Sequence, residues 1–265
     1  MTTNPYPPKR AVDSFRIGER GGGQGGESEW NDFARIDAYS YIMTDLPRGD
    51  RRAFWQSGET TVSEELLPVI RKHGVPLGTA LEIGCGVGRL VFPVAGHFGR
   101  VLGLDISPEM VRQGTSLAGQ RNVANVRFFS LADYKRCPQD FGLAGGCVDF
   151  VYSLIVFQHI SDFHAIRDYF ELVTFSLSPQ GVAYLQFDTR PQDLMYRVKN
   201  SLPDFLLPRT LRRGIRRIRR TADELESGFG DYGLDIIENL GPSTAYNRYV
   251  LRKSKAQRTL HSVIG

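Results

Sequence analysis

Three glycines at alternate positions, Gly84, Gly86 and Gly88, stand between two apolar runs of the sequence. A strand that passes through a glycine-rich turn into a helix brings its backbone close to a nucleotide-like ligand, because glycine has no Cβ to obstruct the approach. Asp105 follows Gly86 by 19 residues, at the end of the next apolar run. A carboxylate there can accept hydrogen bonds from both hydroxyls of a ribose. The pattern therefore predicts a site for a nucleoside-containing ligand.

The spacing of the glycines distinguishes two classes of cofactor. The dinucleotide pattern G-x-G-x-x-G requires its third glycine at position 89, where this chain has arginine. Glu82, two residues before the first glycine, places a negative charge beside the site. That charge suits the cationic sulfonium and ammonium groups of S-adenosylmethionine and disfavours a pyrophosphate. A nicotinamide-dependent oxidoreductase is accordingly the less favoured prediction.

An alternation of apolar runs and helical stretches predicts the elements that position this loop. The strand candidates are residues 79–84, 100–105, 125–130, 148–153, 181–188, 234–240 and 246–254, and Ser107 and Thr221 are predicted helix caps. Only five residues separate the last two strands, too few for a helical crossover, so these strands should pair antiparallel. The predicted fold is α/β: a doubly wound, mostly parallel seven-stranded sheet with one antiparallel strand.

Four segments together resemble those of class I S-adenosylmethionine-dependent methyltransferases, which have a Rossmann-like fold. They are E-I-G-C-G-V-G-R (82–89), G-L-D-I-S-P-E-M (103–110), Asp133 after the third strand, and D-F-V-Y-S-L-I-V-F-Q-H-I (149–160). The resemblance covers approximately residues 55–188. It implies an enzyme whose cofactor is S-adenosyl-L-methionine.

The resemblance also implies which residues surround each part of the cofactor. Those near the methionine part are Glu82, Gly84, Cys85, Gly86 and Gly88, with the backbone of Ser153 and Leu154. Those near adenosine are Asp105 at the ribose, Ile106 and Met110 flanking adenine, and Asp133 at the adenine amino group, with Ala132 beside it. For Cys85 a small side chain is all that the position requires, and no nucleophilic role is predicted.

His159 is the candidate catalytic base. Methyl transfer from a sulfonium is an in-line displacement, so the protein must align the acceptor and, for a hydroxyl, remove its proton. His159 follows the fourth predicted strand at the carboxyl edge of the sheet, and imidazole has a suitable pKa for this task. Several small-molecule members of the family that the chain resembles use a histidine at or beside this position, and others do not. The alternative is a structural histidine that caps the next helix, and Asp162 either orients the imidazole or caps the helix at 163.

The residues after the fourth strand also bear on the acceptor. Related enzymes that methylate an exocyclic amine of a base or a side-chain amide carry Asp/Asn-Pro-Pro-Tyr where this chain has Ser-Leu-Ile-Val (153–156). The sequence shows no Asp/Asp/Asn set for a metal-dependent reaction, so no metal is predicted. A small-molecule acceptor, such as a sugar, a polyketide or another secondary metabolite, is the prediction, with transfer to a hydroxyl or an amine.

Composition divides the chain into a tail and one domain. Residues 1–28 are rich in Pro, Gly and polar side chains and are predicted to form a disordered tail. Residues 29–265 are predicted to form the methyltransferase domain, in which Thr61 and Glu64 form a capping-box pattern and predict a helix start. The resemblance implies that an aromatic-rich N-terminal preface and an insertion after strand five, residues 189–220, close the substrate pocket.

The basic charge of the chain is concentrated in that insertion. The formal net charge is +4, and residues 209–220 carry seven arginines, without which the remainder is slightly acidic. On a helix, Leu211, Ile215 and Ile218 would form an apolar stripe among the arginines. Such a helix could contact an anionic membrane, an acidic carrier or nucleic acid phosphates, or pack on the domain. Because the basicity is confined to one segment, nucleic acid is the disfavoured partner, and a methyltransferase directed to RNA or a membrane-associated acceptor is the alternative function.

The sequence also bears on localisation. No run of residues approaches the length of about 20 apolar residues that crosses a bilayer. The N-terminal residues lack the apolar segment of a secretory signal. The three cysteines contain no C-x-x-C pair and suggest neither a disulfide framework nor structural zinc. A cytoplasmic protein is therefore expected.

Overall fold

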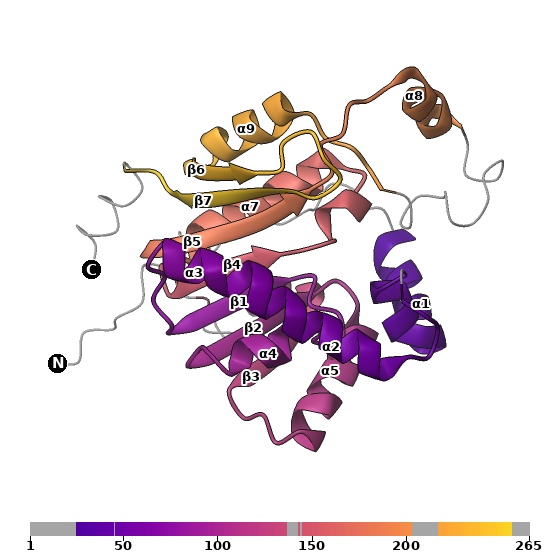
Figure 1. Ribbon diagram of the computed structural model, residues 1–265, viewed down its shortest axis with the longest axis vertical. Coiled ribbons are helices and arrows are strands. Elements are labelled where there is room, and N and C mark those ends of the chain that lie inside the picture. Colours follow the sequence, from indigo (N-terminus) through magenta and orange to yellow (C-terminus); the bar gives the residue numbers. More distant parts are fainter. Residues whose placement is uncertain (1–24, 45, 137–142, 144, 203–216, 256–265) are drawn as a thin grey trace.

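The computed structural model describes residues 25–44, 46–136, 143, 145–202 and 217–255. They build a seven-stranded sheet with the strand order β3-β2-β1-β4-β5-β7-β6 (Figure 1). The strands are β1 (Thr79–Ile83), β2 (Arg100–Asp105), β3 (Val126–Ser130), β4 (Val148–Ser153), β5 (Leu177–Phe187), β6 (Leu234–Leu240) and β7 (Asn247–Lys253). Neighbouring strands are parallel from β3 to β5, whereas β7 is antiparallel to both β5 and β6. The predicted fold is confirmed.

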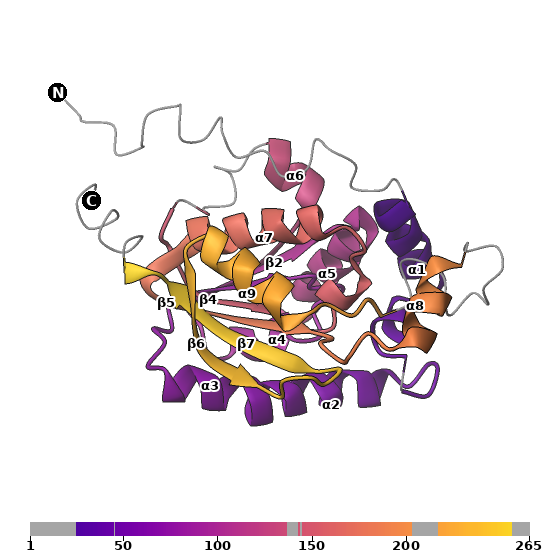
Figure 2. The ribbon, with the colours of Figure 1, turned by 90° about the horizontal axis from the view of Figure 1, so that it is seen from above.

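Helices cover both faces of this sheet (Figure 2). They are α1 (Gly25–Ile42), α2 (Arg51–Thr61), the π-helix η2 (Val62–Leu66), α3 (Leu67–Lys72), α4 (Val91–Ala95), α5 (Pro108–Gln120), α6 (Leu131–Arg136), the 3-10 helix η4 (Phe157–His159), α7 (Phe163–Ser176), α8 (Leu194–Ser201) and α9 (Ala222–Asp231). Apolar residues of η2, α3 and α4 form one core layer, and those of α7 and α9 form the other. Strands β1 and β4 lie between the two layers, which explains why they are apolar on both faces.

Side-chain caps fix the start of three helices near the carboxyl edge of the sheet. Ser107 accepts the amide of Met110 at 3.1 Å, and Thr221 accepts the amide of Glu224 at 3.2 Å, so both predicted caps are confirmed. Asp162 caps α7 through the amide of His164 at 2.9 Å. A cap of this kind satisfies a backbone donor that the helix itself leaves free. The cap on α7 is the second of the two roles predicted for Asp162.

The capping-box prediction at Thr61 is wrong. The helix begins ten residues earlier, where Asp50 accepts the amide of Ala53 at 2.8 Å and α2 starts at Arg51. Thr61 lies inside the continuous helical segment, and its hydroxyl donates to the carbonyl oxygen of Ser57 at 2.8 Å. A threonine hydroxyl inside a helix commonly bonds the carbonyl one turn back, so the pattern alone does not mark a helix start.

The predicted helix over 209–220 is also wrong where the structure describes it. Residues 217–220 are not helical, and Arg219 forms an isolated parallel bridge with Asp188 at the end of β5. Ile218 is buried, which an extended segment against the sheet edge achieves without the helical stripe. Residues 209–216 lie outside the described residues, and the helical part that is described is α8.

The N-terminal tail falls mainly outside the described residues, which begin at residue 25. Helix α1 starts at Gly25, before the predicted boundary at residue 28. Side chains of α1 contact the rest of the domain, as described below. Composition alone does not reveal these contacts. The division of the chain into a tail, residues 1–28, and one domain, residues 29–265, stays a prediction.

Candidate functional site

The glycine loop follows β1 and has the backbone that the pattern predicted. Gly84, Gly86 and Gly88 have φ values of +74°, +53° and +95°, in the left-handed region. The amide of Gly84 donates to the carbonyl oxygen of Leu104 at 2.7 Å, which joins the loop to β2. A Cβ on Gly88 would lie 2.7 Å from the ring of Phe128. Both the backbone angle and the close packing therefore require glycine at position 88.

Asp105, at the end of β2, links this loop to the start of α5. Its Oδ2 accepts the amide of Gly86 at 2.7 Å, and its Oδ1 accepts the amide of Ser107 at 2.9 Å. Burial raises the pKa of Asp105, and these backbone hydrogen bonds oppose that rise. Each carboxylate oxygen can accept a further hydrogen bond, so the group fits a ligand with paired hydroxyls.

Glu82, on β1, is a buried acid with an incomplete set of partners. Its side chain is 4% exposed, and its Oε2 has no hydrogen-bond partner among the described residues. Burial raises the pKa of Glu82 to about 8, and the positive charge of Arg89 opposes this rise. The guanidinium of Arg89 is itself held by the hydroxyls of Ser57 and Thr61, at 3.4 Å each. This buried carboxyl oxygen of Glu82 has no hydrogen-bond partner among the described residues, and it lies next to the glycine loop. It therefore fits a ligand with a cationic group.

Replacing Glu82 with glutamine is expected to make the stability of the ligand-free protein less dependent on pH. The raised pKa means that the folded protein keeps a proton that the unfolded chain releases above about pH 4.5. The wild type should therefore lose stability as the pH rises from 4.5 to about 8, by at most about 1.4 kcal/mol per pH unit. Urea unfolding at several pH values, followed by circular dichroism, measures this slope in both proteins. Equal slopes would mean that Glu82 is already ionised in the fold.

The residues expected beside adenine lie on the same edge of the sheet. Asp105 is in register with Ser130 at the end of β3, and Asp133 follows on α6. The carboxylate of Asp133 accepts the hydroxyl of Ser130 at 2.7 Å and remains partly exposed, and Ala132 is exposed. Ile106 is half-buried. Met110 is buried in a small cluster with Val87 of the glycine loop and with residues of α1 and α2.

The residues after β4 approach the glycine loop from the other side. Ser153 donates its hydroxyl to the carbonyl oxygen of Ile83 at 2.9 Å, and Leu154 is buried. Ile155 has a φ of +63°, a strained conformation for a β-branched residue. Val156 then packs so closely over Gly84 that a Cβ there would lie 2.3 Å from its side chain. Sequence reasoning did not identify Ile155 or Val156, because neither side chain signals chemistry.

Helix α1 lies across this carboxyl edge (Figures 1 and 2). The side-chain oxygen of Asn31 accepts the hydroxyl of Ser107 at 2.7 Å and the amide of Glu109 at 3.1 Å. Ile42 packs against Gly86, where a Cβ would lie 2.6 Å from its side chain. Of the aromatic residues predicted in the preface, Trp30 meets the His159 ring edge-on, at 5.9 Å between centroids. Helix α1 is thus part of the candidate site, and Asn31 is a residue that sequence reasoning missed.

The other preface aromatics pack mainly on protein. Tyr39, Phe54 and Trp55 form edge-to-face contacts with one another, with ring centroids 4.8 to 5.8 Å apart. Tyr41 stacks on Phe33 at 4.1 Å. These rings pack against other side chains of the preface, whereas Trp30 contacts His159.

His159 is the last residue of the short helix η4, which begins directly after Val156. Its amide donates to the carbonyl oxygen of Val156 at 2.9 Å, and its Nε2 lies 3.2 Å from the side-chain nitrogen of Gln158. The N-cap of α7 is Asp162. The histidine and the glycine loop therefore share one edge, connected through Val156.

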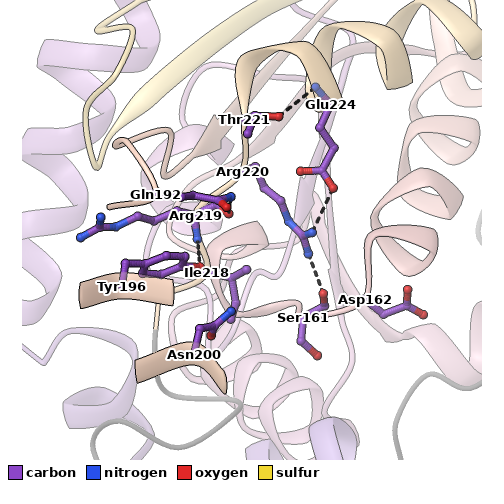
Figure 3. Close-up of a pocket in the computed structure, with 10 residues that line it drawn as sticks. All are labelled: Ser161, Asp162, Gln192, Tyr196, Asn200, Ile218, Arg219, Arg220, Thr221 and Glu224. Carbon is purple, nitrogen blue, oxygen red and sulfur yellow. Dashed lines mark hydrogen bonds and ion pairs between the residues drawn. The ribbon is translucent and has the colours of Figure 1, made fainter. Parts of the chain in front are cut away.

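A polar cavity of about 550 Å³ opens beside this segment (Figure 3). It is lined by Ser161, Asp162, Gln192, Tyr196, Asn200, Ile218, Arg219, Arg220, Thr221 and Glu224. The lining comes from the loop after η4, from α8, and from the segment that leads into α9. Each arginine is paired, Arg219 with Asp193 and Arg220 with Glu224, at 3.2 Å. The cavity can therefore offer both donors and acceptors of hydrogen bonds.

Among the described residues, no group of three or more His, Cys, Asp or Glu side chains is arranged to hold a metal ion. No helix in that part of the chain combines the length and the apolar character needed to cross a membrane.

Comparison with known proteins places this geometry in a family. Residues 80–181 match a family model described as a methyltransferase domain, and a search of curated proteins found no match. Solved structures match at low identity. The protein PH0226 from Pyrococcus horikoshii OT3 is 19% identical, with a TM-score of 0.59, over 84% of this chain and 99% of its own.

Two further solved structures have named activities. The magnesium protoporphyrin IX methyltransferase ChlM from Synechocystis PCC 6803, with bound SAH, is 22% identical, with a TM-score of 0.55, over 85% of this chain and 99% of its own. An S-adenosylmethionine-dependent methyltransferase from Clostridium acetobutylicum ATCC 824 is 14% identical, with a TM-score of 0.56, over 85% and 99%. At these identities the structures show a shared fold. Residues 80–181, which include the glycine loop, Asp105 and His159, are therefore a methyltransferase domain with the class I fold, and its cofactor is S-adenosyl-L-methionine.

Proposed function

We propose that this enzyme methylates a hydroxyl or an amine of a small-molecule acceptor and that His159 removes the acceptor's proton. The observation that supports this proposal is the shared position of His159 and the glycine loop at the carboxyl edge, with Val156 between them. When bound, the cofactor supplies an electrophilic methyl group on a cationic sulfur. The protein must then hold the acceptor in line and accept its proton, which imidazole can do near neutral pH.

For the cofactor, the proposal assigns separate tasks to the residues of the two strand ends. Asp105 holds the ribose hydroxyls, and Glu82 faces the cationic end. The glycine loop, with Cys85, and the backbone of Ser153 and Leu154 enclose the methionine part. Ile106 and Met110 flank adenine, and Asp133, with Ala132 beside it, meets the adenine amino group.

The proposal places the acceptor in the cavity of Figure 3. Ser161 and Asp162, which line the cavity, follow His159 by only two and three residues. Two buried atoms of lining residues, Nε of Arg220 and Oδ1 of Asn200, have no hydrogen-bond partner among the described residues. One is a donor and the other an acceptor, so a polar acceptor molecule with hydroxyl groups would satisfy both.

Calorimetric titration tests the cofactor assignment. The protein should bind S-adenosylhomocysteine and should not bind NADH, because Arg89 stands where a dinucleotide loop needs glycine. A screen of sugars, polyketides and amines with methyl-labelled S-adenosylmethionine then identifies the acceptor. Binding of NADH alone would contradict the cofactor assignment, and transfer of label only to RNA or to membranes would contradict the small-molecule assignment.

The alternative, a methyltransferase directed to RNA or to a membrane-associated acceptor, rests on the arginines of 209–220. In the described part of that range, Arg219 and Arg220 are engaged within the fold, in ion pairs with Asp193 and Glu224. Arginines that neutralise phosphates give binding that weakens steeply with salt. RNA binding or methyl transfer that is lost between low and moderate salt would favour this alternative, whereas transfer to a neutral small molecule that is insensitive to salt would exclude it.

A further inference from the structure

The loop that carries His159 is held by a segment that is distant in sequence. The amide of Ile218 donates to the carbonyl oxygen of Gln158 at 2.6 Å. The guanidinium of Arg220 donates through Nη2 to two more carbonyl oxygens, those of Ile160 at 2.9 Å and Ser161 at 2.7 Å. Carbonyl groups on both sides of His159 are therefore bonded to residues 218 and 220, about 60 positions later in the chain.

Further contacts hold the side chain and the backbone of Arg220. Its side chain is 10% exposed, and its Nη1 lies 3.2 Å from Oε1 of Glu224. Its guanidinium lies over the ring of Phe163, 5.2 Å from the centroid, and its amide donates to the carbonyl oxygen of Asp188 at 2.8 Å. Figure 3 shows the side chain reaching from the start of α9 toward Ser161. Arg220 thus connects the end of β5, through its amide, and the start of α9, through its guanidinium, to the loop after β4.

These hydrogen bonds add to the packing of the loop, in which Phe157 is buried and stacks on Phe187 with 4.9 Å between ring centroids. Between β4 and α7 it contains the strained residue Ile155 and the short helix η4, whose backbone bonds are local. Hydrogen bonds from a charged donor are about twice as strong as those between neutral groups. A catalytic side chain must be held within about 0.5 Å of its productive position, which a short loop cannot ensure alone.

We propose that Arg220 is a positioning residue for methyl transfer, which holds the His159 loop by bonding the carbonyl groups of Ile160 and Ser161. This inference rests on the proposed role of His159 as base. It assigns to one of the seven arginines of 209–220 a task inside the enzyme, independent of any partner of the others. Lysine cannot replace this arginine fully, because an ammonium lacks the planar fork that reaches two carbonyl groups and a carboxylate together.

The test compares four variants of the full chain, Arg220→Met, Arg220→Lys, His159→Gln and Arg167→Met. Arg167, on α7, is the matched control, since its ion pair with Asp231 at 2.6 Å lies on the surface. Each protein is titrated with S-adenosylhomocysteine and assayed with the acceptor found in the labelled-cofactor screen. Histidine side-chain ¹⁵N NMR, with the His159 signal assigned from its absence in His159→Gln, reports on the imidazole without any acceptor.

Arg220→Met should lower kcat by about 10- to 100-fold, because a displacement of the catalytic group by about 1 Å can cost about 100-fold in rate. Binding of S-adenosylhomocysteine should stay within about twofold, guanidinium chloride at millimolar concentration should restore part of the rate, and the His159 signal should shift or broaden. Arg220→Lys should be intermediate, and Arg167→Met should match the wild type in all of these measurements.

Two results separate the possible failures. If His159→Gln keeps the wild-type kcat, the base assignment is wrong, and the positioning role falls with it. If His159→Gln loses activity while folded Arg220→Met or Arg220→Lys keeps the wild-type kcat and His159 signal, the base assignment stands and the positioning proposal is overturned. A loss of kcat in Arg220→Met that guanidinium does not restore, with an unchanged His159 signal, would also overturn it.

Discussion

Replacing Asp105 with alanine is expected to weaken the binding of S-adenosylhomocysteine by about 100-fold or more. In the proposed cofactor site Asp105 accepts two ribose hydroxyls, and each hydrogen bond to a charged group contributes about 1.5–3 kcal/mol. The substitution also removes the acceptor for the amides of Gly86 and Ser107, so the glycine loop loses its connection to α5. Isothermal titration calorimetry measures the change in dissociation constant.

A carboxylate on strand β4 supplies the control for this experiment. Asp149, at the amino end of β4, accepts the amide of Thr79 at 3.0 Å and the hydroxyl of Ser178 at 2.9 Å. Asp149→Ala should therefore lose stability, since it also leaves backbone and side-chain donors without an acceptor, but keep its affinity for S-adenosylhomocysteine. If Asp105→Ala also kept its affinity, Asp105 would serve only to shape the loop.

Replacing His159 with glutamine is expected to lower kcat by about 10²- to 10⁴-fold, the usual contribution of a general base. Glutamine preserves much of the size and polarity of histidine, so the edge contact with Trp30 and the packing of η4 should largely persist. Binding of S-adenosylhomocysteine should stay within about twofold, because His159 is not one of the proposed cofactor-binding residues.

The pH dependence of the same variant distinguishes a base from a structural residue. In the wild type, kcat should rise with pH through the range in which an imidazole loses its proton, and His159→Gln should lack that rise. His164 is the matched control, since its side chain is exposed on the first turn of α7, and His164→Gln should behave as the wild type. An unchanged kcat in His159→Gln would leave His159 a structural role.

The covering of the glycine loop by α1 has a consequence for both experiments. Asn31 and Ile42 contact the loop region directly, so the helix must accommodate the cofactor where it now packs. Truncations that begin after α1 would expose Gly86 and remove Trp30 from His159, and they would change binding and turnover together. The full chain is therefore the form in which both variants should be measured.

The sequence by itself determined the features that depend on neighbouring residues. Glycines with positive φ, the caps at Ser107 and Thr221, and the strand that ends at Asp105 are all fixed within a few positions of the chain. The antiparallel pairing of the last two strands followed as well, because their connection is too short for a helical crossover. These local rules sufficed to predict the fold class and the glycine loop with Asp105, whereas the other cofactor residues came from the resemblance to a family.

Only the tertiary structure decided the features that depend on distant partners. The extended course of residues 217–220 comes from bonds to Gln158 and Asp188, and their arginine-rich pattern alone favoured a helix. Asn31 joined the site through Ser107, 76 positions away, and Thr61 fell inside a helix that Asp50 had already started. Polar groups of the backbone and the side chains form hydrogen bonds with whichever partners the fold brings near. A sequence pattern predicts only the partners that lie close along the chain.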